Sequence, residues 1–358
     1  FKGIVHVYVP KTAVKWSLQA LIRSPVSMNG NFGEDVAVDG ERLVISANGY
    51  LLYDGVVFVY ECCSDNRWFI TGTITSPLAV EGSPNRAIAQ GFGYRVDMSG
   101  SWLISSTSVN NAYIYEEVSA GNWVLNTELV APANESFFGR AVAIEGDLAV
   151  VGAYGYNGSH GQVYVYQRSN SDNTWHLFDT LLAQRNHSSF GFSVDISGDK
   201  VVVGANGFRP GQFENNPNFD WRNTAQRNNS GWAYVYQSDG TRMVFDQEIE
   251  SPVGNNSYFG SGVGIHEDSI VVGADGFPCN TQTGAGFVYN RYSDGWKLNQ
   301  SHPSPAGDHG HFGYAVDINS QFSVIGAYGF DDGRGSVYLA ERWKHSYVVD
   351  DVPTALPT

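Results

Sequence analysis

Six Asn-x-Ser sequons are the most specific chemical signal in this chain of 358 residues. A sequon is the acceptor for N-linked glycosylation in secreted proteins. Three of the six stand four residues before a Phe-Gly pair, in the stretches NESFFG, NHSSFG and NNSYFG. The sequons predict N-linked glycans, with ordinary polar loop residues as the alternative, at Asn134, Asn157, Asn186, Asn228, Asn255 and Asn299.

Carboxylate side chains recur at one position after alternate Phe-Gly pairs, as Asp97, Asp195 and Asp317. Buried carboxylates at matched sites would suit acid–base chemistry. The alternative is that they bind backbone N–H groups or face water in a central channel. The sequence shows no nucleophile elbow, phosphate loop or zinc-type Cys/His spacing. We therefore predict a protein that is not an enzyme.

A second group of ligand-type side chains lies in the stretch SHPSPAGDHGHFG. Imidazole and carboxylate groups bind transition metals, which makes weak metal-site candidates of His302, Asp308, His309 and His311. An ordinary polar loop is the alternative. We predict no resident metal or cofactor other than N-linked glycans.

The Phe-Gly pairs belong to a tandem repeat with a period of roughly fifty residues. Each pair opens an apolar hairpin, as in FGFSVDISGDKVVVGANG, which is followed by an alternating run ending in Tyr and, in all but one repeat, by a Trp. Six repeats carry the pair, at Phe32, Phe92, Phe138, Phe190, Phe259 and Phe312. Seven carry the alternating run, at Tyr8, Tyr60, Tyr115, Tyr166, Tyr236, Tyr289 and Tyr338.

Each repeat has the pattern of four strands. Runs of β-branched and aromatic residues that alternate with a period of two, bounded by Gly, Asn and Asp, are typical of strands. The second run, for example 201–203, is apolar on both faces and so indicates a strand buried between sheets. Four-stranded sheets covered on both faces suit a β-propeller. We predict an all-β propeller of seven repeats over residues 1–351, followed by a Pro/Thr tail or linker start at 352–358.

This pattern of Phe-Gly, apolar hairpin and Gly-Ala resembles the FG-GAP repeat of integrin alpha-chain propellers. The resemblance covers almost the whole chain and implies a propeller. The family's third residue, Pro, is Tyr, Asn or Asp here. Calcium binding is also implied, yet the Asp-x-Asp-x-Asp-Gly ligand run is absent, and Asp331-Asp332-Gly333 is too short for a calcium cage. The Gly-Ala pairs start at Gly152, Gly204, Gly273 and Gly326, with Ser46-Ala47 a variant and Ser105-Ser106 a departure.

The first repeat, residues 1 to about 25, has only its third and fourth strands, because seven alternating runs accompany six Phe-Gly strands. An unpaired strand edge invites another chain. We expect this half-blade to be completed by upstream sequence or, through strand addition, by a neighbouring subunit. The partners are then other proteins or copies of the chain itself.

A long insertion, residues 208–232, lengthens one loop between a second and a third strand. Long loops on rigid scaffolds carry function, and aromatic and Arg side chains are favoured interface anchors. The insertion is therefore a candidate partner-binding loop, with a self-packed loop as the alternative. Its candidate residues are Phe213, Phe219, Trp221, Arg222 and Trp232. In an up-and-down blade, five of the sequons share the face of this loop, whereas Asn299 falls in or after a fourth strand at the outer rim.

Three cysteines are present, of which Cys62 and Cys63 are adjacent in a turn and Cys279 lies in a loop on the opposite face. A disulfide needs Cα atoms within about 7 Å, so Cys279 should not reach the pair within one chain. The alternatives are a vicinal disulfide, cross-links between subunits, or inert thiols.

The composition favours an extracellular address. The net charge of −15 disfavours nucleic acids and anionic membrane surfaces as partners, and no apolar run approaches the roughly 20 residues of a membrane span. The chain opens on Phe1 rather than Met, so we expect that a signal peptide was removed or that upstream sequence is not included.

The sequence as a whole predicts a non-catalytic secreted glycoprotein, acting as a structural or adhesive unit of an extracellular assembly such as a surface filament, a matrix or an adhesion complex. One alternative is a carbohydrate-binding propeller, which would repeat an exposed aromatic in several blades. A second alternative is a hydrolase or lyase that uses the channel-lining carboxylates. The fold alone does not decide among these.

Overall fold

The computed structural model describes the chain except for residues 1–2, 13–14, 27–29, 51–53, 64, 78–90, 132–136, 185–188, 208–229, 255–256, 279–280, 306–308, 343–345 and 349–358. Within the described ranges, no helix has the length and hydropathy needed to span a bilayer. The chain divides into two compact units, one of Phe1–Val151 and Val165–Leu177, the other of Gly152–Tyr164 and Phe178–Thr358.

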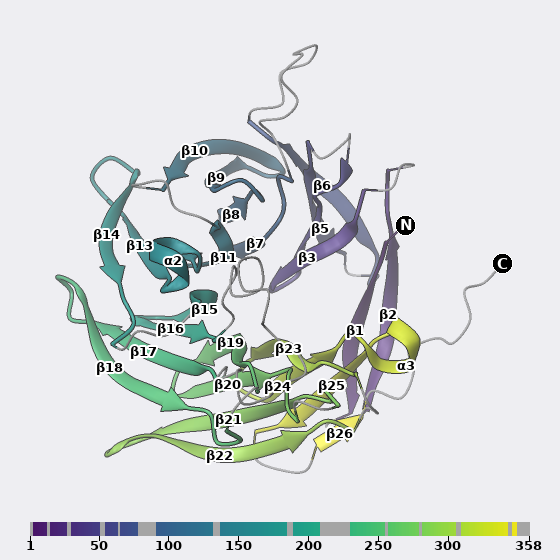
Figure 1. Cartoon of the computed structure of the whole chain (residues 1–358). Coiled ribbons are helices and arrows are strands. Elements are labelled where there is room, and N and C mark those ends of the chain that lie inside the picture. Colours follow the sequence, from purple (N-terminus) through teal and green to yellow (C-terminus); the bar gives the residue numbers. More distant parts are fainter. Residues whose placement is uncertain are drawn as a thin grey trace, which may run out of the picture. The chain divides into compact units, whose positions relative to one another are not determined.

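The described strands form six four-stranded sheets and one two-stranded sheet, each with its strands in chain order (Figure 1). Every four-stranded sheet is an up-and-down meander, which is the blade of a propeller. The predicted all-β propeller, with six complete blades and an N-terminal half-blade, is confirmed.

The half-blade is β1 (Ile4–Thr12) and β2 (Lys15–Arg23). The blades are β3 (Phe32–Asp39), β4 (Arg42–Ala47), β5 (Val56–Cys62) and β6 (Trp68–Thr75); β7 (Val96–Ser99), β8 (Trp102–Ser106), β9 (Asn111–Ser119) and β10 (Asn122–Val130); β11 (Phe138–Glu145), β12 (Leu148–Ala153), β13 (Gln162–Arg168) and β14 (Trp175–Leu181); β15 (Phe190–Ser197), β16 (Lys200–Ala205), β17 (Trp232–Ser238) and β18 (Met243–Glu250); β19 (Phe259–His266), β20 (Ser269–Ala274), β21 (Ala285–Tyr292) and β22 (Gly295–Pro303); β23 (Phe312–Ile318), β24 (Phe322–Ala327), β25 (Ser336–Glu341) and β26 (Ser346–Val348).

The Phe-Gly pair fixes the start of the first strand in each blade. Its glycine has a φ between 81 and 98° in all six copies, a backbone conformation that side chains strongly disfavour. Its phenylalanine is buried, with at most 4% of its surface exposed. Only β7 begins later, at Val96, because the N–H groups of Gly93 and Tyr94 both bond to the carbonyl of Ser106 instead of extending the strand.

The Gly-Ala glycine of one blade receives the Phe-Gly strand of the next. A Cβ added to Gly273 would lie 1.7 Å from the carbonyl oxygen of Gly313, and one added to Gly204 would lie 2.2 Å from that of Gly260. No side chain fits such a contact, so the two glycine signatures of the repeat meet across the interface between blades.

Two details of the repeat alignment differ from the sequence expectation. Ser105 pairs with Val96, so Ser106 and Thr107, rather than Ser105-Ser106, occupy the Gly-Ala position of that blade. In the last blade Tyr338 pairs with Ile325, and the position that Tyr289 holds in the preceding blade belongs to Ala340.

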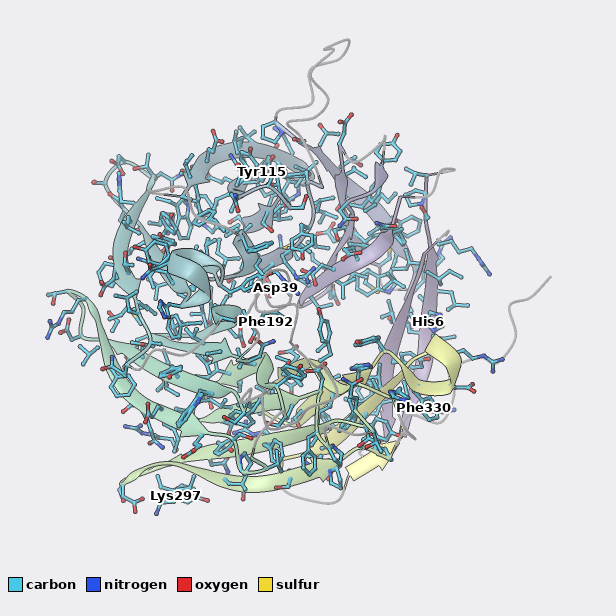
Figure 2. The ribbon with its side chains drawn as sticks, in the orientation of Figure 1. His6, Asp39, Tyr115, Phe192, Lys297 and Phe330 are labelled. Atoms are coloured by element: carbon cyan, nitrogen blue, oxygen red, sulfur yellow. The ribbon has the colours of Figure 1, made fainter. Side chains whose placement is uncertain are left out.

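Two one-turn helices lie in loops between second and third strands. They are α2 (Tyr156–Ser159) and α3 (Phe330–Gly333). The ring of Phe330, labelled in Figure 2, packs against the buried cluster of β23–β25. Asp331, which belonged to the short acidic run considered for calcium, forms a 2.9 Å ion pair with Arg334.

Candidate interaction surface

The half-blade repeats the outer half of a complete blade. β1 and β2 pair antiparallel with a bulge after Val7, as β5 and β6 do with a bulge after Val59. Gly3 lies against the carbonyl oxygen of Phe32, where an added Cβ would be 1.7 Å away, and Gly55 makes the same kind of contact with the next blade. The half-blade therefore docks on blade β3–β6 as complete blades dock on one another.

Gln19 shows how the fourth strands are joined. It is the bulged residue of β2, and its Oε1 accepts the indole N–H of Trp68 at 3.2 Å. Asp246, the bulged residue of β18, accepts the indole N–H of Trp296 at 2.9 Å in the same way. These bonds give the repeated fourth-strand Trp a role in attaching a blade to its predecessor.

The free edge of the half-blade lies along β1. Among the described strands β1 pairs with β2 alone, whereas its counterpart β5 pairs with strands on both sides. Val5 and Val7 are half-buried, while their counterparts Val57 and Val59 are 0% and 1% exposed. β1 thus has an edge that no other described strand pairs with, beside partly exposed apolar side chains, the arrangement that accepts an added strand.

The neighbouring strand β3 is also uncovered. Val38 is 66% exposed and Val36 is 46% exposed, although the residues at the same positions of β15, Ile196 and Val194, are only 6% and 8% exposed. The first unit therefore carries a continuous apolar region, β1 with β3, that its own described residues leave open. We call this region the β1–β3 surface.

The matched carboxylates bind backbone N–H groups, and two of them also bind across a blade interface. Asp97 accepts the N–H groups of Met98 and Ile144, and Asp195 accepts those of Ile196 and Ile265, at 2.7 to 2.9 Å. Asp317 accepts the N–H of Ile318 at 2.7 Å. This is the backbone-binding role that the sequence analysis set beside the acid–base one.

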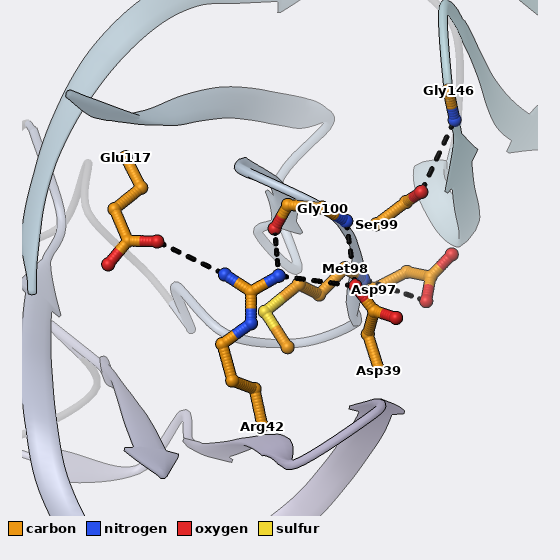
Figure 3. A network of polar contacts seen from close by, with 8 residues as sticks. All are labelled: Asp39, Arg42, Asp97, Met98, Ser99, Gly100, Glu117 and Gly146. Carbon is orange, nitrogen blue, oxygen red and sulfur yellow. Dashed lines mark hydrogen bonds and ion pairs between the residues drawn. The ribbon is translucent and has the colours of Figure 1, made fainter. Parts of the chain in front are cut away.

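Turns between first and second strands are fastened to one another as well (Figure 3). The carboxylate of Asp39 accepts the N–H of Gly100 at 2.7 Å, and Arg42 donates to the carbonyl of Gly100. One blade later, Ser99 accepts the N–H of Gly146 at 3.3 Å. Polar side chains at these positions therefore link consecutive blades.

Asp35 gives the structure a pH-dependent element. Burial raises its pKa to about 6, although Arg95 and the N–H of Val96 oppose that rise. Between pH ~4, where an unfolded Asp titrates, and pH 6, the folded state binds more protons than the unfolded state, so this carboxyl lowers stability as the pH rises through that window. We therefore compare the free energy of unfolding in urea of Asp35→Asn with that of the unmodified protein. The difference should shift in favour of the variant by about 1–2 kcal/mol from pH 4 to pH 7.5.

Asp294→Asn is the matched control for this measurement. A hydrogen bond from Lys297 lowers the pKa of Asp294, so its removal should shift relative stability in the opposite direction over the same pH range. If the stability of Asp35→Asn changed with pH just as that of the unmodified protein does, the raised pKa of Asp35 would be contradicted.

Two of the predicted glycosylation sites lie in the described ranges, and both are exposed. Asn157 is in α2, in a loop between a second and a third strand, as expected. Asn299 is the bulged residue of the fourth strand β22. At this bulge Gln19 and Asp246 accept a hydrogen bond from a Trp of the next blade, whereas Asn299 faces solvent. Asn134, Asn186, Asn228 and Asn255 lie outside the described residues.

The candidate partner-binding loop lies mostly outside the described residues. Phe213, Phe219, Trp221 and Arg222 are among those not described. Trp232 is the first residue of β17, pairs with Ala205 and is half-buried. It belongs to the blade rather than to the loop.

The adjacent cysteines are free thiols in the structure. Cys62 ends β5 and Cys63 follows it in the turn to β6, as the sequence predicted. Burial raises the pKa of the Cys62 thiol, with the nearby Glu41 adding to the rise. Cys279 lies outside the described residues.

The His-rich stretch separates into unlike environments. His309 is exposed and His302 is half-buried in β22, where burial lowers the pKa of His302. His311 forms a 3.4 Å contact with Asp275 and stacks on Tyr328 at a ring distance of 4.7 Å. The described residues contain no group of three or more potential metal ligands. Asp308 lies outside them.

The position after Gly-Ala carries an exposed aromatic side chain in one described blade rather than in several. Tyr328 is 53% exposed and Tyr314, 5.2 Å away, is 37% exposed. Tyr154, which follows Gly-Ala as Tyr328 does, is only 7% exposed because Phe192 covers it. At this position the described blades therefore do not repeat the exposed aromatic that the carbohydrate-binding alternative calls for.

Sequence reasoning missed Gln19 and the exposed valines of β3. The signal for Gln19 was present, because a polar residue follows the repeated Trp by three positions in several repeats. No signal marked Val36 or Val38, whose residue types match those of buried strand positions.

Comparisons with known proteins match one stretch of the chain to a repeat family and the chain to two solved structures. Residues 123–166 match the FG-GAP repeat family model. The crystal structure of Saccharomyces cerevisiae Sqt1 is similar over 92% of this chain and 91% of that one, with 10% identity and a TM-score of 0.44. The crystal structure of the computationally designed Ika8 protein is similar over 85% of this chain and 69% of that one, with 14% identity and a TM-score of 0.47. No curated protein matches significantly in sequence.

Proposed function

We propose that this β-propeller, which matches the FG-GAP repeat model over residues 123–166, is a secreted, non-catalytic glycoprotein. It serves as a structural or adhesive unit of an extracellular assembly. It holds a partner protein by strand addition at the β1–β3 surface.

The open edge of β1 is the observation that carries this proposal. Its pairing and docking contacts are those of a blade, yet one strand edge is unpaired among the described strands. Unpaired edges with partly exposed apolar side chains are sites at which proteins add strands from partners. The β1–β3 surface adds side-chain burial to the backbone pairing that such a strand would make.

Further features support an extracellular scaffold. FG-GAP repeats are typical of extracellular and surface proteins, and the sequon asparagines Asn157 and Asn299 are exposed to solvent. Asp97 and Asp195 are engaged by two backbone N–H groups each, which supports a structural role for the matched carboxylates.

The first test is the state of the protein isolated from its native source. We expect intact mass above that of the chain, removed by peptide N-glycosidase, with modified peptides at Asn157 and Asn299. We also expect ordered assemblies by electron microscopy, in which the amides of β1 exchange more slowly than in the recombinant chain alone. An unmodified monomer with the same exchange in β1 would contradict the proposal.

Two proline variants separate edge pairing from folding. Successive N–H groups of a strand point to opposite edges, so only one of His6→Pro and Val7→Pro removes a donor from the free edge of β1. That variant should fold and lose assembly, because Pro blocks strand addition. The other should loosen β2 from β1. Normal assembly by both variants would show that β1 is not the site.

A further inference from the structure

At the blade interfaces of the second unit, glycines at equivalent positions lie against the Phe-Gly pair of the next blade. Gly204 and Gly273 leave room for the carbonyl oxygens of Gly260 and Gly313. A second glycine, just before the third strand, does the same for the phenylalanine. A Cβ added to Gly284 would lie 2.0 Å from the carbonyl oxygen of Phe312, which also bridges to Gly284. Two glycines per blade thus form the socket for the next Phe-Gly strand.

The last blade keeps both socket glycines, but no described residue occupies the socket. Gly326 stands where Gly273 does, yet the nearest described atom to an added Cβ is 3.5 Å away, on Ala315. Gly335 corresponds to Gly284, and its nearest such atom is 3.7 Å away. Glycine weakens a strand compared with alanine, so Gly326 has no steric reason to be glycine in the described protein alone.

Other groups around this socket are open as well. Val337 in β25 is 42% exposed, whereas Val163 and Ala233, at the same position of their blades, are 0% exposed. Asp317 accepts only the N–H of its own neighbour Ile318 among the described residues. Asp195, at the same position, accepts a second N–H from the following blade.

We infer that the β23–β25 face is a socket for a Phe-Gly β-hairpin from outside residues 1–358. This inference rests on the proposed function and names the chemistry of the partner. The glycine carbonyl of the donated pair lies over Gly326 and its phenylalanine carbonyl over Gly335. The sixth residue after its Phe offers its N–H to Asp317, as Ile265 does to Asp195.

The continuity of this face with the existing interfaces argues for that occupant. The same two glycines, apolar position and carboxylate recur at interfaces that already hold a Phe-Gly strand. A second copy of residues 1–358 has no spare hairpin to give, because each of its six Phe-Gly pairs leads into the first strand of one of its own sheets. The occupant is therefore a Phe-Gly hairpin from outside residues 1–358.

A synthetic peptide tests the inference with the full chain. The probe is FGFSVDISGDKVVVGA, the hairpin of residues 190–205, and the control peptide carries Ser in place of its Phe. We expect saturable binding in calorimetry, slower amide exchange in 323–341, and binding at least tenfold weaker for the control peptide. Gly326→Val should also weaken binding at least tenfold, because the side chain fills the socket while the free fold has room for it.

Tethering the hairpin to the chain tests the socket even when the free peptide binds weakly. The same hairpin, joined to the chain by a Gly/Ser linker of about 20 residues, should raise the melting temperature in the parent chain but not in the Gly326→Val variant. No effect in the tethered form, or binding indifferent to Gly326→Val, overturns the inference. If the chain dimerises without peptide and amide exchange in 323–341 slows, a second copy occupies the socket, which also overturns the inference. If the protein assembles with slower amide exchange in β1 but does not bind the peptide, the proposed function stands. Only the inference of a Phe-Gly hairpin is then overturned.

Discussion

Replacing Gly273 with alanine is expected to destabilise the protein by about 3 kcal/mol, at the upper end of what overpacking costs. The added Cβ would lie 1.7 Å from the carbonyl oxygen of Gly313 and 2.6 Å from its carbonyl carbon. Backbone atoms cannot move aside as a flexible side chain would, so blades β19–β22 and β23–β26 must separate locally. The measurement is the free energy of unfolding in urea, supported by the melting temperature.

Gly326→Ala is the matched control, because it makes the same change at the same position of the following blade. With the nearest described atom 3.5 Å from the new Cβ, the variant should match the unmodified protein or exceed its stability by up to about 1 kcal/mol, the gain expected for alanine over glycine in a strand. Equal destabilisation by both substitutions would show that the β23–β25 face is already filled.

The second large effect is expected from Asp195→Ala. The substitution leaves the N–H groups of Ile196 and Ile265 without their acceptor, and both residues are buried. An unsatisfied buried donor costs about 1–3 kcal/mol, so we expect a loss of about 3 kcal/mol in urea unfolding. Asp195→Asn should fall between, because an amide offers one acceptor oxygen rather than two.

Asp317→Ala is the corresponding comparison. Asp317 accepts one described N–H, that of Ile318, and its side chain is exposed, so water can replace it. The expected loss is below about 1 kcal/mol. A loss as large as that of Asp195→Ala would argue against bonding across the interface as the cause.

The repeat unit and the half-blade were predictable from sequence because their signals are local. Phe-Gly requires a positive φ and a buried ring at one point, and an apolar run such as 201–203 requires cover on both faces. Seven alternating runs against six Phe-Gly pairs then gave the half-blade β1–β2.

The contacts across interfaces were not predictable because one partner is usually a backbone group. Asp39, Asp97 and Asp195 bond to N–H groups 61, 47 and 70 residues away, and a backbone N–H leaves no trace in residue identity. The Ser105-Ser106 alignment was wrong by one residue for a related reason. The carbonyl of Ser106 takes two N–H groups from the turn at Gly93 and Tyr94, which shortens β7 without any change in the repeat's residue pattern.

The direction of these bonds has a consequence for how such a protein changes over generations. In most of them the side chain belongs to the earlier blade and the backbone group to the later one, as with Asp97 and Ile144 or Ser197 and Glu267. A mutation in the later blade therefore leaves the bond intact as long as its main chain keeps its path. Neighbouring repeats are free to diverge without compensating each other, and the surfaces of single blades can acquire new partners while the joints between blades persist.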